Sequence, residues 1–150
     1  MAYDELLRQR LLQPYQARPR EVERLLQVAS RDLATAARLL PEDRDWAFNI
    51  AYNAALQAAR AWMLHTGYRA RGPDQHRTTV RFCELTLGSE HQPQLALLDQ
   101  IRRKRNRLVY EMAGLVSQQE ARQALDFANA FVEEIRGLIS NQPRMQLGDS

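Results

Sequence analysis

The chain has 150 residues, of which 45% are hydrophobic and 26% charged, and its formal net charge is +3. This length suits one domain with a core that needs no disulfides, and the composition is ordinary for a globular protein. Charged residues interrupt the first ten positions and no apolar run could span a bilayer, so we expect neither a secretory leader nor a membrane function. The single cysteine, Cys83, has no disulfide or zinc partner, and we expect it to pack in the core of a cytoplasmic protein.

The periodicity predicts an all-α fold, an up-and-down bundle of four to five helices, because no run shows sustained alternation of apolar and polar residues. We divide the chain into an N-terminal arm over residues 1–19, a helical bundle over 20–140 and a flexible tail over 141–150. The arm is expected to contain a short helix over 4–13, which Pro14 ends. The bundle helices are predicted at 21–40, 45–65, 74–87, 93–113 and from a capping box at 117–120 onward.

The helix predicted at 45–65 is apolar almost all round, including Trp46, Trp62 and Met63, so we place it at the centre of the bundle. One edge of it is polar. The polar positions recur at spacings of four, four and three, and they are Asn49, Asn53, Gln57 and Arg60. In an otherwise buried helix such a strip needs hydrogen-bond partners or a cleft.

The helix predicted at 93–113 has an arginine in its apolar stripe. The stripe has the alternating spacing of three and four that is typical of a core-facing helix surface, and it contains Leu98, Ile101, Arg105, Leu108, Met112 and Leu115. The guanidinium of Arg105 must therefore be paired, lie in a wet cleft or meet another subunit, because burying it alone costs several kcal/mol. Arg102, Asn106 and Tyr110 fall on the adjoining strip and add hydrogen-bond donors beside the stripe.

Basic residues are concentrated in two segments. Residues 99–111 hold five basic and two acidic side chains, and residues 66–81 hold four arginines against Asp74. If the two segments meet, they form a surface that attracts phosphate; otherwise they are solvated charged faces. A helix-turn-helix DNA reader is less favoured, because Arg105 would face inward and no short helix pair precedes it.

The order of these motifs resembles the HEPN superfamily of small all-α bundles that bind nucleotides or RNA. The resemblance covers roughly residues 20–140 and depends on the helix at 51–62, the Gly67-Tyr68 turn, His76, Arg105-Asn106 and Val109-Tyr110. It implies that Arg105 is the motif arginine and Asn106 the polar residue beside it. Tyr110 stands where the family has a histidine, and Met112 where some members have a tyrosine. A phenol, with an ordinary pKa of about 10, is a poor base near neutral pH.

The resemblance implies an RNA- or nucleotide-binding protein that does not cleave, or cleaves weakly, in a toxin-antitoxin, defence or sensing context. The candidate ligand-binding residues are Arg102, Arg105, Asn106, Tyr110, Asn53, Gln57 and His76. The expected partners are a second copy of the chain in a homodimer, RNA or a nucleotide, and a nucleotidyltransferase-type protein. We expect no cofactor and no metal, because the sequence has no phosphate loop, glycine-rich dinucleotide turn, zinc spacing or paired Glu-x-x-His.

Two alternatives remain open. In the first, the protein is a metal-independent endoribonuclease in which Arg105 and Asn106 act with Tyr110 or His76 in proton transfer. In the second, Arg105 and Asn106 form a structural hub with Asn53 and Gln57, or a subunit interface, and no ligand binds.

Overall fold

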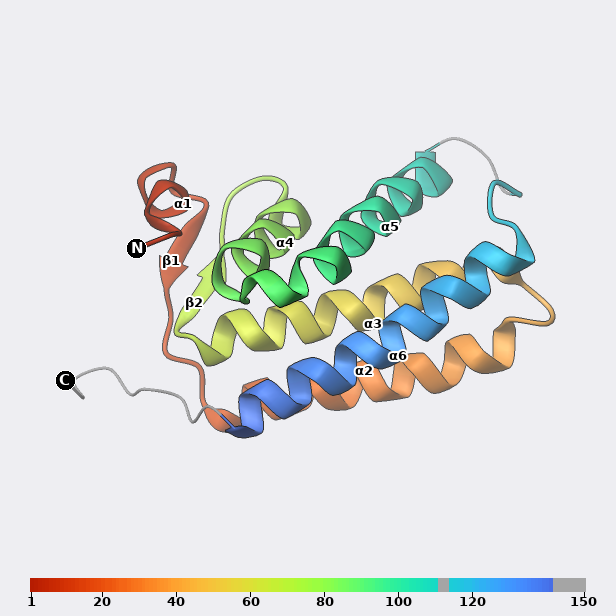
Figure 1. The fold of residues 1–150 in the computed structure, drawn as a ribbon, viewed down its shortest axis with the longest axis horizontal. Helices are drawn as coiled ribbons and strands as arrows, with labels where there is room; N and C mark the ends of the chain where they lie inside the picture. The colour runs from red at the N-terminus through yellow and green to blue at the C-terminus, as the bar shows by residue number, and fades with distance from the viewer. Residues whose placement is uncertain (111–113, 142–150) are drawn as a thin grey trace.

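The computed structural model describes residues 1–110 and 114–141, and the side chains of all of these except Val109 and Tyr110. The fold is an all-α bundle with one very small sheet, which confirms the predicted class (Figure 1). Its elements are α1 (Asp4–Arg8), β1 (Leu12–Pro14), α2 (Pro19–Leu39), α3 (Arg44–His65), β2 (Tyr68–Ala70), α4 (Gln75–Thr86), the 3-10 turn η1 (Ser89–His91), α5 (Gln92–Tyr110) and α6 (Gln118–Asn141). The predicted end of the fourth helix at Ala113 and the predicted tail beyond Asn141 lie outside the described residues.

Helix α3 lies at the centre, as its apolar sequence predicts. Asp43 caps its first turn by accepting a hydrogen bond from the Trp46 amide at 3.1 Å. Helices α2 and α6 pack along one side of α3, and α4 and α5 lie across the other side (Figure 1). Among the described helices none has the length and apolar character needed to cross a membrane.

The short sheet was not predicted. Strands β1 and β2 pair antiparallel, with Leu12 opposite Ala70 and Pro14 opposite Tyr68. Each strand has only three residues, which is too short for an alternating pattern to be recognised. The predicted helix over 4–13 is also wrong beyond Arg8, because Arg10 adopts a φ of 60° that ends the helical turn and lets the chain extend into β1.

The N-terminal arm packs on the bundle. Leu6, Leu12 and Ala17 are buried in the same core as the long helices. The Tyr3 ring lies 4.8 Å from that of Tyr68 and 5.4 Å from that of Phe82, so residues from three distant segments form one aromatic cluster. Figure 1 shows α1, β1 and β2 gathered beside α4 at one end of the bundle.

Two core predictions for α3 are confirmed and one is wrong. Trp62 and Met63 are buried, and the Trp62 indole donates to the Thr86 hydroxyl of α4 at 2.9 Å. Trp46 is 57% exposed, whereas Ala47 and Phe48 of the same turn are buried, so Trp46 lies on the uncovered side of the start of α3. Cys83 is fully buried as predicted, and burial raises the pKa of its thiol far above the ordinary value.

Candidate functional site

Arg105 is half-buried on the face of α5 that looks toward α3. Its Nε donates to the Asn49 side-chain oxygen at 3.1 Å, and its guanidinium carbon lies 5.8 Å from the centre of the Tyr52 ring. No carboxylate of the described residues lies within ion-pair distance of it. The charge expected in the apolar stripe is therefore held by an amide and an aromatic face rather than by an anion. We name Arg105, Asn49, Tyr52 and His76 the Arg105 centre.

His76 completes this centre from the first turn of α4. The Tyr52 hydroxyl lies 3.1 Å from His76 Nδ1, so these two side chains are hydrogen-bonded. Tyr52 is buried, and burial raises its pKa to about 12, so that the phenol stays neutral. Burial and the nearby charges of Arg105, Arg60 and Arg102 lower the pKa of His76. The imidazole is therefore neutral near pH 7, and its Nε2 makes no hydrogen bond within the described residues.

Tyr52 is the site residue that the sequence interpretation missed, because it was counted among the apolar residues of α3. Its spacing was the available signal. Tyr52 stands three positions after Asn49 and directly before Asn53, so it adjoins the polar strip of the helix. A tyrosine beside such a strip carries a hydroxyl that needs a partner when it is buried.

The other residues predicted on α5 have different surroundings. Arg102 is mostly covered, with 13% of its side chain exposed, and its Nε donates to Asp99 at 2.9 Å. Asn106 is half-buried, and its side chain makes no hydrogen bond within the described part of the chain. Tyr110 is the last residue of α5, and its side chain lies outside the described structure, as does Met112.

The polar strip of α3 continues away from Arg105 as a chain of hydrogen bonds. Asn53 donates to Asp32 of α2 at 2.8 Å, Gln57 donates to Asn53 at 3.4 Å, and Arg60 donates to Gln57 at 2.9 Å. Within this strip, the Arg105 guanidinium bonds only to Asn49. Asn53 bonds instead to Asp32, and Gln57 bonds to Asn53. The strip thus finds both the partners and the cleft that its position in a buried helix requires.

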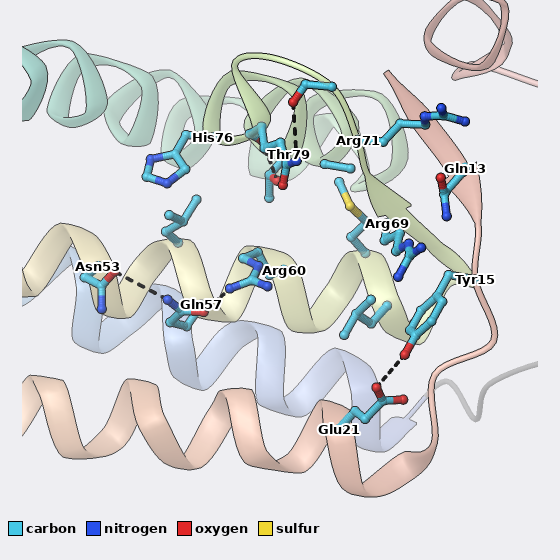
Figure 2. A pocket seen from close by; sticks show the side chains of 16 residues that line it. Gln13, Tyr15, Glu21, Asn53, Gln57, Arg60, Arg69, Arg71, His76 and Thr79 are labelled. Carbon is cyan, nitrogen blue, oxygen red and sulfur yellow. Dashed lines mark hydrogen bonds between the residues drawn. The ribbon is translucent and has the colours of Figure 1, made fainter. Parts of the chain in front are cut away.

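That cleft is a pocket of about 640 Å³ along α3 (Figure 2). Three predicted ligand residues line it: Asn53, Gln57 and His76. The other polar lining residues come from α3, β2, the start of α4, the N-terminal arm and the first turn of α2. The two basic segments of the sequence approach each other at His76, which lines the pocket and also contacts Tyr52 beneath Arg105.

Over residues 1–110 and 114–141, no three histidine, cysteine, aspartate or glutamate side chains gather as a metal site would require. The chain was also compared with known proteins. The family model of the HEPN domain matches residues 22–138, which cover the bundle from α2 to α6. No curated protein matches the chain.

Proposed function

The chain belongs to the HEPN domain family, and from this premise we propose that it binds RNA or a nucleotide through the Arg105 centre. The family is generally associated with RNA. The phosphate is held by the Arg105 guanidinium, with His76 beside it and Asn106, Arg102 and Tyr110 on the same helix as supporting contacts.

The observation that carries this proposal is the free hydrogen-bonding capacity of Arg105. Its Nε donates a hydrogen bond to the Asn49 side-chain oxygen, while its terminal N–H groups make no hydrogen bond within the described residues. Several other arginines of the chain form ion pairs, among them Arg8, Arg31, Arg102, Arg103 and Arg136. The Arg105 guanidinium is planar, is held against the Tyr52 ring and has no ion-pair partner within the described residues. Its terminal N–H groups therefore suit bidentate binding of a phosphate.

The proposal is tested by the substitution Arg105→Ala with a labelled single-stranded RNA, measured by fluorescence anisotropy at low salt. We expect a loss of affinity of about tenfold or more, the scale of one strong charged contact, and an affinity that falls steeply with salt. Arg122→Ala, an exposed arginine on α6, is the matched control and should bind like the wild type. If the wild type binds no RNA or nucleotide and Arg105→Ala lowers stability by a few kcal/mol, the residue is a structural hub instead.

A second candidate function is metal-independent RNA cleavage, which the neutral His76 beside Arg105 favours. Nε2 of His76 would take the proton of a ribose 2′-hydroxyl, whose oxygen attacks the adjacent phosphorus and displaces the 5′-oxygen, which takes up a proton from solvent. Without a histidine at position 110, we propose that this reaction is absent or slow. Incubation with RNA in EDTA distinguishes the two functions, with His76→Ala and Tyr110→Phe as controls, and intact RNA at high protein concentration rejects cleavage.

We further propose a homodimer in the cytoplasm and a role in a toxin-antitoxin, defence or sensing system, with a nucleotidyltransferase-type protein as partner. The support for this setting is the family resemblance. Light scattering in solution tests the first part, since a dimer has twice the 17.4 kDa mass of the chain. A monomer at micromolar concentration contradicts it.

A further inference from the structure

The pocket in Figure 2 meets the Arg105 centre only at His76, and its other end carries arginines that the proposed function does not use. Arg60 comes from the C-terminal half of α3, Arg69 from β2, and Arg71 directly follows β2. All three are exposed. We call the stretch of the pocket from His76 to this end the basic groove and define it by Gln13, Tyr15, Arg60, Arg69, Arg71 and His76.

The arginines of the basic groove have neutral partners. Arg60 donates to the Gln57 side-chain oxygen at 2.9 Å. The guanidinium carbon of Arg69 lies 4.7 Å from the centre of the Tyr15 ring. Arg71 forms no ion pair within the described residues, although its backbone amide donates to Leu11 at 2.9 Å. None of these three charges is therefore neutralised by a neighbouring carboxylate in the described part of the chain.

The charge of the groove is clearly positive. The lining of the whole pocket contains the three arginines and one carboxylate, Glu21, whose oxygen accepts a hydrogen bond from the Tyr15 hydroxyl. Figure 2 shows this pair at the end of the pocket, away from Arg60 and His76. A concave site lined by one sign of charge concentrates its field and attracts anions.

The N-terminal arm builds this end of the pocket. Strand β1 pairs with β2 so that Gln13 lies opposite Arg69, and Tyr15 is the first residue after β1. With its amide oxygen turned toward Arg69, Gln13 accepts from Arg69 Nε and Nη2, both at 2.7 Å. Gln13 and Tyr15 precede residue 22, where the match to the family model begins. The arm therefore adds a wall that lies outside the matched domain and fixes the Arg69 guanidinium over the Tyr15 ring.

We infer that the basic groove binds the phosphodiester backbone of single-stranded RNA, as an extension of the Arg105 centre. This inference depends on the proposed function. His76 joins the two parts, because it lines the groove and contacts Tyr52 of the Arg105 centre. From Tyr52 to Met63, at the far end, α3 rises about 16 Å at 1.5 Å per residue, a distance that one nucleotide does not bridge.

The chemistry of the groove favours an unpaired strand. Arginines bind the phosphates, the exposed guanidinium plane of Arg69 offers a surface on which a base stacks, and the Asn53 and Gln57 amides can meet base edges. A recessed pocket accepts bases that are turned out of a helix, which only single-stranded RNA provides readily.

The test compares RNA length with position of substitution. Labelled oligouridylates of two and of about twelve nucleotides, the latter within the usual range of single-strand sites, are titrated into the full chain. The variants are Arg69→Ala/Arg71→Ala for the groove, Arg105→Ala for the centre, and Arg38→Ala/Arg122→Ala as a control that removes two exposed charges outside the pocket. Thermal melting verifies that each variant is folded.

We expect the groove variant to bind the longer RNA about tenfold more weakly and to bind the dinucleotide like the wild type. The slope of log affinity against log salt should fall in magnitude by about 1.4, since each single-strand contact contributes about 0.7. Arg105→Ala should weaken both lengths, and the control should change neither.

Other results overturn the inference in distinguishable ways. If the wild type binds neither RNA, the proposed function fails as well. If Arg105→Ala loses binding while the groove variant keeps wild-type affinity for the longer RNA, only the groove inference fails. Equal loss for uridine monophosphate and the longer RNA in the groove variant indicates a site for a free nucleotide. Equal competition by polyglutamate indicates an acidic polypeptide as the ligand.

Discussion

A buried tyrosine explains how an arginine can occupy the apolar stripe of α5. The flat guanidinium of Arg105 keeps its charge while its face meets the Tyr52 ring and its edge meets Asn49. Tyr52 in turn bonds His76, so one side chain of α3 sets the positions of residues from α4 and α5. A change at Tyr52 should therefore affect both helices.

Protonation of His76 should make the protein less stable at mildly acidic pH. Its pKa in the folded state lies below the ordinary value of 6.5, because of burial and the charges of Arg105, Arg60 and Arg102. The unfolded chain thus binds a proton that the folded chain resists. This part of the stability is present above about pH 6.5 and is lost as the pH falls from there through the lower pKa of the folded state. The slope is at most about 1.4 kcal/mol per pH unit for one proton.

The measurement is urea unfolding between about pH 7.5 and pH 5.0, above the range in which carboxylates titrate. In His76→Gln the slope should be shallower than in the wild type, because the variant lacks the imidazole at position 76 and is otherwise the same chain. Identical slopes would show that His76 titrates in the folded protein as it does in the unfolded chain.

At the scale of single residues, the sequence predicted that Arg105 lies in the apolar stripe of its helix. It did not predict the partners of its guanidinium, which are Asn49 and Tyr52. The stripe could be read from spacing alone, whereas the partner on α3 depends on how α5 crosses that helix. The partners of Asn53 likewise depend on the position of Asp32 on α2. Trp46 was wrongly predicted to be buried for a similar reason, since the sequence of a helix that is apolar almost all round does not show which side its neighbours leave uncovered.

Among the secondary-structure elements, the long helices were predictable and the sheet was not. The helix over 45–65 was predicted within one residue of the observed start of α3, because its apolar run is long and bounded by Pro41 and Gly67. The strands are stabilised by pairing between residues more than fifty positions apart in the sequence. A pattern of neighbouring residues cannot predict such a pairing. The sequence consequently left the packing of the arm open, and the structure places Leu6, Leu12 and Ala17 in the core.

Substitution of Leu12 tests whether this arm contributes to global stability. Leu12 is 2% exposed in β1, so Leu12→Ala should lower the free energy of unfolding by about 2–4 kcal/mol through lost burial and an unfilled cavity. Urea denaturation followed by circular dichroism measures the loss. Gln16→Ala, an exposed change in the same arm, should stay within about 0.5 kcal/mol of the wild type. An unchanged midpoint for Leu12→Ala would mean that the arm detaches without cost.

For the molecule as a whole, small side chains on α3 decide how closely the other helices approach. Ala54, Ala58, Ala59 and Ala61 are completely buried. Because α3 packs against α2, α4 and α6, bulk at these positions would push more than one neighbour away. The central position of the helix thus depends on its alanines as much as on its large apolar residues.

Overpacking should reveal this dependence. Ala59 lies against α4, where its carbonyl oxygen is 3.7 Å from the Cys83 sulfur. We expect Ala59→Leu to destabilise the fold by about 1–3 kcal/mol or more, because the interior has no room for three extra carbons. Ala130→Leu, on the exposed face of α6, is the matched control and should be close to neutral in thermal melting. A neutral Ala59→Leu would show unfilled space between α3 and α4.

The burial of the chain's one thiol has a practical consequence for labelling experiments. Cys83 is inaccessible and its pKa is raised, so maleimides should not react with the native protein. A cysteine introduced at an exposed position such as Ser30 would then carry a single fluorophore without removal of the natural residue. In the unmodified chain, the rate at which a thiol reagent reacts reports directly on how often the α3–α4 interface opens.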